Sequence, residues 1–142
     1  AGINKSIEEK TEQFNSIKET ATALMVNLNE EKAILDKKIS KIDKKINKAI
    51  KKRDKQQEKV DKMLVSIEQE KKNGNESFAN IQQSQVDDWL IDIQDYNEDI
   101  QDLENDKVGL DEKFNELNLE HTNLISEMTA LNREILSLKQ EL

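Results

Sequence analysis

The chain has 142 residues, of which 37% are charged, 35% hydrophobic and 4% aromatic. It contains no proline, no cysteine and only three glycines, which excludes disulfides, thiolate metal sites and cysteine nucleophiles. No run of about eighteen apolar residues is present, so a membrane-spanning helix is not expected. High charge without helix breakers favours long helices over a globular core that encloses an active site.

The net charge of −8 is the sum of a first segment, residues 1–31, with 3 Lys against 6 acids, and of two longer blocks of opposite sign. Residues 32–72 carry 15 Lys and Arg against 7 acids, whereas residues 76–142 carry 4 against 17. The excess of acid argues against nucleic acid as a partner, and no membrane partner is expected either. The lack of cysteine and of a signal-peptide pattern predicts an intracellular protein, cytoplasmic or nuclear.

The first predicted helix spans about residues 3–72. Its second half repeats apolar residues at positions a and d of a heptad (positions a to g), which predicts a coiled-coil seam. These seam residues include Ile39, Ile46, Val60 and Ile67 at a, and Leu35, Ile42, Ala49 and Met63 at d. Nearer the N-terminus the apolar spacing runs out of step, and a stutter over residues 28–35 accounts for the shift.

A turn is predicted at residues 73–77, the only cluster of turn-forming residues in the chain. Gly74 adopts positive φ at little cost, and Asn75 or Ser77 is suited to cap a following helix. The second predicted helix spans about residues 77–142. Six leucines fill consecutive d positions there: Leu103, Leu110, Leu117, Leu124, Leu131 and Leu138.

The two seams pair in one antiparallel register. Placing a opposite d joins Met63 to Val86, Val60 to Trp89 and Ile46 to Leu103, and each pair is centred on the junction between Gly74 and Asn75. The heptads and the turn composition thus locate the same bend independently. We predict an all-α fold in which residues 1–142 form a single long antiparallel two-helix coiled-coil hairpin, and we expect the chain to be a fragment of a longer protein.

The charges on one side of the seam favour the same pairing. Position g faces g in an antiparallel pair, so the register sets three lysines of the first helix opposite three aspartates of the second: Lys45 with Asp106, Lys52 with Asp99, and Lys59 with Asp92. We expect this arrangement to neutralise most of the basic run 37–62, whose lysines we read as distributed around the helix rather than along one face.

Apolar residues outside the seam predict a further partner helix. Ile50, Leu64 and Leu90 occupy e positions beside the seam, Val65, Ile91 and Ile125 add to the apolar surface, and Trp89 lies at the seam itself. Such residues widen the apolar stripe, as in helices that contact several neighbours. We expect homo-oligomers, most simply two hairpins pairing into a four-helix assembly, or binding to other helical proteins.

Polar residues within the seam have structural interpretations. His121, the only histidine, lacks companions for a metal site, so a half-buried structural histidine is expected. Lys107 faces Ile42 and can extend to nearby acids. Arg53 either stacks on Tyr96 or bends out to Asp92, Asp95 or Asp99. No catalytic residue, metal or cofactor is expected.

The leading interpretation is a non-catalytic structural coiled coil that acts as a spacer, scaffold or oligomerisation arm. A long hairpin also resembles the coiled-coil arms of chromosome-maintenance ATPases, which leave and return to one head. This chain differs from the hook-bearing members of that family, since it has no Cys-X-X-Cys at the turn and no Walker motif. A third interpretation is a rod that binds nucleic acid or anionic membrane through residues 37–62.

Overall fold

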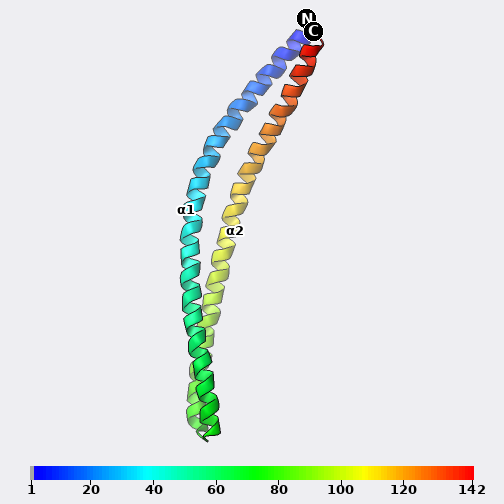
Figure 1. Ribbon diagram of the computed structural model, residues 1–142. Helices are drawn as coiled ribbons and strands as arrows, with labels where there is room; N and C mark the ends of the chain where they lie inside the picture. The colour runs from blue at the N-terminus through cyan, green and yellow to red at the C-terminus, as the bar shows by residue number, and fades with distance from the viewer. Residues whose placement is uncertain (1) are drawn as a thin grey trace. The chain divides into compact units, whose positions relative to one another are not determined.

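A computed structural model describes residues 2–142 as two helices, α1 (Gly2–Lys72) and α2 (Glu76–Gln140), packed against each other (Figure 1). Helix accounts for 96% of the chain, and no strand occurs among the described residues. The predicted all-α hairpin is confirmed. Because α2 ends at Gln140, the predicted seam position Leu142 lies outside the helix and is 72% exposed.

The turn ends α1 and starts α2 within three residues. Gly74 has φ of +83°, its N–H donates to the Lys71 carbonyl oxygen, and the Asn75 N–H donates to the Glu70 carbonyl oxygen. These two bonds make a Schellman motif, which requires the left-handed backbone that glycine adopts without a Cβ penalty. The Asn75 carbonyl oxygen accepts the first α2 bond, from Ala79 N–H. Asn75 rather than Ser77 therefore occupies the N-cap position of α2, and its side-chain Nδ2 donates to Glu70 Oε2 at 2.7 Å.

The hairpin divides into two compact units. The turn unit is Lys38–Val108, and the terminal unit combines the residues up to Lys37 with Gly109–Leu142. On α1 the division falls just after the predicted stutter, where residues 29–34 and 36–38 are all exposed. On α2 it falls at Gly109, where a Cβ would meet nothing within 4 Å. No neighbouring group therefore approaches Gly109 closely enough to require a glycine there. The helix α2 continues through this position without a break.

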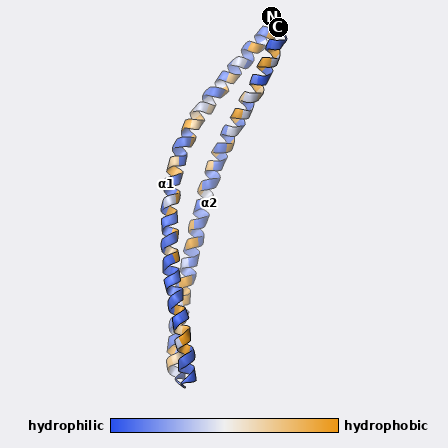
Figure 2. Cartoon of the chain, viewed as in Figure 1, coloured by the Kyte–Doolittle hydropathy of each residue, from blue (hydrophilic) through white to orange (hydrophobic). Residues whose placement is uncertain are grey.

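The turn unit has a continuous core. Five buried residues from the two helices form it, with Met63 and Trp89 packed against them: Val60, Ile67, Ala79, Val86 and Ile93. Val60 and Val86 are each 1% exposed. All seven occupy a or d positions, so the seam alone builds the core, and hydrophobic residues recur along both helices between longer hydrophilic stretches (Figure 2).

The terminal unit has its own seam and its own register. Ala21, Leu28 and Ile135 are buried there, and His121 is half-buried as predicted. The Lys10 ammonium forms an ion pair with the Glu134 carboxylate, so the first turns of α1 lie beside the last turns of α2. Extending the predicted register would have set Lys10 opposite Lys139. A stutter inserts about four residues into one of the two paired helices. It accounts for most of the five-residue difference between Lys139 and Glu134.

Candidate interaction surface

The two sides of the turn unit differ in chemistry because the antiparallel pairing gathers e positions on one side and g positions on the other. Two hydrogen bonds support this register. Gln56 Nε2 donates to Asp92 Oδ2 across the g side at 3.1 Å, and Arg53 Nη1 donates to Asn97 Oδ1 across the e side at 3.2 Å. The e side and the g side are therefore formed by both helices together.

The e side carries no charge over its central six positions. We name this surface the charge-free flank: Ile50, Gln57 and Leu64 from α1, with Gln83, Leu90 and Asn97 from α2. Leu64 and Leu90 are 44% and 45% exposed, and Ile50 is half-buried. Large apolar side chains on both helices are thus left partly in water on the same side of the seam.

The two glutamines of the charge-free flank are held in matching ways. Gln57 Nε2 donates to Asp61 Oδ1 at 3.0 Å on α1, and Gln83 Nε2 donates to Asp87 Oδ1 at 3.1 Å on α2. Both acceptors lie one turn further along at b positions, which border the flank. The flank therefore has an apolar and amide centre, with an acidic rim on each helix.

The structure places the predicted interaction residues in three different settings. Leu64, Leu90 and Ile91 are exposed near the turn, with Ile91 58% accessible. Trp89 packs against the core of the turn unit, and Ile125 is 43% exposed in the terminal unit. Val65 is also exposed near the turn, as are two apolar residues that the sequence analysis did not select, Phe78 and Ile81. In the sequence, each of these two residues could have been recognised as an apolar residue at a heptad position other than a or d.

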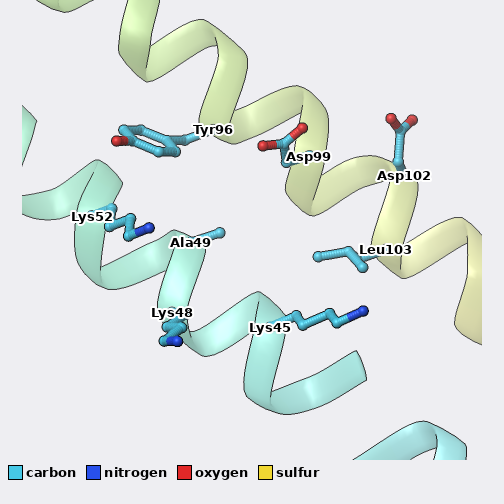
Figure 3. A pocket seen from close by; sticks show the side chains of 8 residues that line it. All are labelled: Lys45, Lys48, Ala49, Lys52, Tyr96, Asp99, Asp102 and Leu103. Atoms are coloured by element: carbon cyan, nitrogen blue, oxygen red, sulfur yellow. The ribbon is translucent and has the colours of Figure 1, made fainter. Parts of the chain in front are cut away.

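The g side forms a charged groove of about 370 Å³. Its floor is apolar, made of Ala49, Tyr96 and Leu103, because the small Ala49 leaves space at a d position. Figure 3 shows its two walls, with lysines from α1 and aspartates from α2: Lys45, Lys48 and Lys52, with Asp99 and Asp102. A partner approaching this side would have to remove water from ammonium and carboxylate groups.

The three Lys–Asp ion pairs predicted for the g side are not formed among residues 2–142. No N···O distance within 4.0 Å joins Lys45 to Asp106, Lys52 to Asp99 or Lys59 to Asp92. Asp92 instead accepts the hydrogen bond from Gln56. Exposed ion pairs gain only about 0.2–1 kcal/mol and must offset the entropy of two long side chains. Complementary rows of charge face each other here without direct pairing.

The lysines of α1 lie along one face, which corrects the expectation that they surround the helix. In the heptad that the buried seam defines, every lysine from Lys38 to Lys62 occupies position c, f or g, and all of them are exposed. These three positions are adjacent on the helix and opposite the charge-free flank. Among the described residues, the one ion pair of this lysine face joins Lys62 to Glu58 at 3.6 Å.

Polar residues in the seam reach partners at its edge. Lys107 Nζ forms an ion pair with Asp43 Oδ1 at 2.7 Å, which confirms that its side chain extends to a nearby acid. Arg53 contacts Asp54 and Asn97, so neither predicted arrangement of this residue is correct. Gln82 is a buried polar residue that the sequence analysis missed, since it lies at a d position between the predicted seam and the turn.

Residues 2–142 contain no group of three or more His, Cys, Asp or Glu side chains placed to hold a metal ion. No helix in the described part of the chain is both long enough and apolar enough to cross a membrane. No family model matches the chain, and no curated protein or solved structure matches it either. The charge-free flank and the lysine face are the two surface features that distinguish the turn unit.

Proposed function

We propose that this chain is a non-catalytic structural coiled coil, and that it acts as an oligomerisation arm or scaffold whose first partner is a second copy of the hairpin. The observation that carries the proposal is the charge-free flank. In a sequence that is 37% charged, six adjoining positions contributed by two helices contain no charge. Two leucines on that surface are close to half exposed.

A partner would gain most from covering this side of the seam. Packing apolar side chains away from water stabilises association by about 25 cal/mol per Å² of apolar area, and e positions beside a seam are the ones that become interior in a four-helix bundle. The g side instead presents ammonium and carboxylate groups, which are costly to desolvate. The two sides thus favour an assembly that buries the charge-free flank and leaves the charged groove in water.

Replacing Leu64 and Leu90 together with aspartate is expected to dissociate the oligomer. Burying a carboxylate without a partner in an apolar interface costs at least about 2 kcal/mol for each substitution, so the association constant should fall about a thousandfold or more for the pair. Sedimentation equilibrium of the full chain measures this change directly. Circular dichroism reports whether the variant remains helical. We expect it to do so, because Leu64 and Leu90 lie outside the core.

The matched control is a second double Leu→Asp variant, with Leu119 and Leu136 changed in the terminal unit. These residues are 61% and 53% exposed, more than Leu64 and Leu90. The control should keep the wild-type association constant. A wild-type chain that stays monomeric at high concentration, or a control that dissociates as much as the test variant, would contradict the proposal.

The lysine face supports a second candidate function, binding of double-stranded nucleic acid through phosphates. Its lysines lie on one side of α1 and are exposed, with no apolar or aromatic residue among c, f and g positions from Lys38 to Lys62. That composition suits binding to phosphates, whereas a membrane surface helix needs an apolar face. The lysine face lies opposite the charge-free flank, so the two functions are compatible.

Fluorescence anisotropy with a labelled duplex of about 20 base pairs at low salt tests this candidate. Changing Lys44, Lys48, Lys51 and Lys55 to glutamine should weaken binding and reduce the slope of log affinity against log salt by about 0.9 for each phosphate that the protein no longer neutralises. The matched control changes four exposed lysines away from this face: Lys5, Lys18, Lys32 and Lys71. Equal loss of affinity in both variants, or no binding by the wild type, rules out the lysine face as a specific site.

A further inference from the structure

We infer that the second hairpin packs on the charge-free flank with its turn at the opposite end, so that α1 faces α1 of the other copy and α2 faces α2. This inference rests on the proposed self-association and specifies its geometry. Two copies that use the same patch are related by a two-fold axis lying in the interface. Such an axis runs either across the helices, which points the turns in opposite directions, or along them, which puts the turns together.

The charge-free flank has the same pattern of apolar and amide side chains from either end. Along α1 the order is apolar, amide, apolar: Ile50, Gln57 and Leu64. Along α2 the order is amide, apolar, amide: Gln83, Leu90 and Asn97. The two central residues, Gln57 and Leu90, lie opposite each other across the hairpin in the register that the seam defines. One axis across the helices therefore passes through the centre of both patterns.

With the axis across the helices, every contact between the two flanks joins residues of one kind. Leu90 meets Leu90 of the second copy at the axis, and Ile50 meets Leu64 two turns away. The amides then meet amides, which can donate to and accept from each other. With the axis along the helices, each apolar residue would instead meet an amide, as Leu90 would meet Gln57. Matching like with like removes more apolar area from water and leaves fewer amide groups without a hydrogen bond.

Ile91 supplies a second observation for the same axis. It is 58% exposed, lies beside Leu90 at an f position and takes no part in the seam. With the axis across the helices, Ile91 approaches Ile91 of the second copy next to the pair of Leu90 side chains, and the four residues form one apolar cluster. With the axis along the helices, Ile91 would approach the carboxylate of Glu58. The turns-apart arrangement is therefore the one that gives this exposed isoleucine an apolar partner.

The acidic rim does not distinguish the two orientations, because both bring two pairs of aspartates together. Asp54 meets Asp61 of the second copy when the axis runs across the helices, and Asp61 meets Asp87 when it runs along them. The remaining b positions pair an aspartate with Gln94 in either case. The lysine face lies on the far side of α1 and reaches the rim only at its edge, so its charge does not set the orientation.

Two contacts at the outer edge oppose the inferred orientation. Glu58 approaches its own counterpart across the axis, although it already pairs with Lys62 at 3.6 Å. Lys51 would approach Glu98 of the second copy only with the turns together. All of these side chains are exposed, so each contact is weak and is screened by salt, whereas apolar burial is not. Association in the inferred orientation should therefore strengthen as the salt concentration rises.

Distances between spin labels test the orientation, and the cysteine-free chain accepts a single label at any chosen site. Ser77 and Asn105 are exposed sites near the two ends of α2 in the turn unit, and each is replaced by cysteine in a separate variant. With the turns apart, the distances between copies should reach about 40 Å for Ser77→Cys and about 45 Å for Asn105→Cys before any lateral offset, from the helix rise of 1.5 Å per residue on either side of Leu90.

A mixture of the two variants is the matched control. A donor dye on Ser77→Cys and an acceptor dye on Asn105→Cys should lie at nearly equal height when the turns are apart. Energy transfer in this mixture should therefore exceed that in a mixture with both dyes on Ser77→Cys.

The reverse ranking, with spin-label distances below about 35 Å in both variants, would show that the turns lie together, since helices in a bundle pack about 8–10 Å apart and the label arms add to this spacing. That result would overturn the inferred orientation while leaving self-association intact. Absence of energy transfer in both mixtures would overturn the orientation as well, and a monomer mass in sedimentation at the same concentration would overturn the proposed self-association with it.

Discussion

The Val86→Asp variant is expected to lose the folded turn unit. Val86 is 1% exposed and lies in the middle of the core, with Ile67 next to it toward the turn and Val60 next to it on the other side. An aspartate there would place a carboxylate among apolar side chains without a partner, at a cost of about 3–5 kcal/mol. The free energy of unfolding of a whole domain is only about 5–15 kcal/mol. A two-helix core has no second layer to compensate for the loss.

Urea denaturation followed by tryptophan fluorescence measures this effect locally. Trp89 is the only tryptophan and packs against the core of the turn unit, so its emission reports that unit rather than the terminal one. The matched control is Val108→Asp, the same change on the same helix at a side chain that is 54% exposed. It should shift the free energy of unfolding by less than about 0.5 kcal/mol. Similar losses in both variants would mean that Val86 is not in a dry core.

The seam was predictable residue by residue because burial in a two-helix pair depends almost entirely on heptad position. Every predicted a and d residue of α2 from Val86 to Leu138 is buried or half-buried, including the polar Lys107 and His121. The turn followed equally well, because Gly74 is the residue that the left-handed position requires. Such features are local or periodic, and a single sequence contains that information.

The partners of long polar side chains were less predictable. The register correctly brought Lys52 and Asp99 to one groove, yet it did not determine whether their charged ends meet. Each such interaction is a small difference between Coulomb attraction, desolvation and side-chain entropy. Arg53 illustrates the same point, since an amide oxygen of Asn97 serves it as well as the aspartates that the sequence suggested.

The charge-free flank was only half visible in the sequence. The apolar members Ile50, Leu64 and Leu90 were identified from their e positions. Gln57 and Gln83 were not, because an uncharged polar residue gives no hydropathy signal, and their significance depends on which residues lie across the seam. The offset at Lys10 and Glu134 likewise required coordinates, since a stutter can be absorbed by either helix.

Gln82→Leu is expected to stabilise the turn unit by about 1–3 kcal/mol. Gln82 is 8% exposed, and its Nε2 donates to Ser66 Oγ at 2.9 Å, but its buried Oε1 has no hydrogen-bond partner among the described residues. An unsatisfied buried acceptor carries its full desolvation cost, and leucine is favoured at d positions. Ser66 loses one bond but remains able to donate to a carbonyl of the preceding turn.

The same urea titration followed by Trp89 fluorescence measures this gain in the free energy of unfolding. Gln85→Leu is the matched control, because Gln85 lies three residues further along α2 on the exposed g side and should change stability by less than about 0.5 kcal/mol. If Gln82→Leu destabilises the turn unit, or gains no more than the control, Oε1 must be satisfied in solution. A gain confined to Gln82→Leu would show that the hairpin tolerates a costly polar residue beside its turn, at a seam position where polar side chains commonly fix the register of a coiled coil.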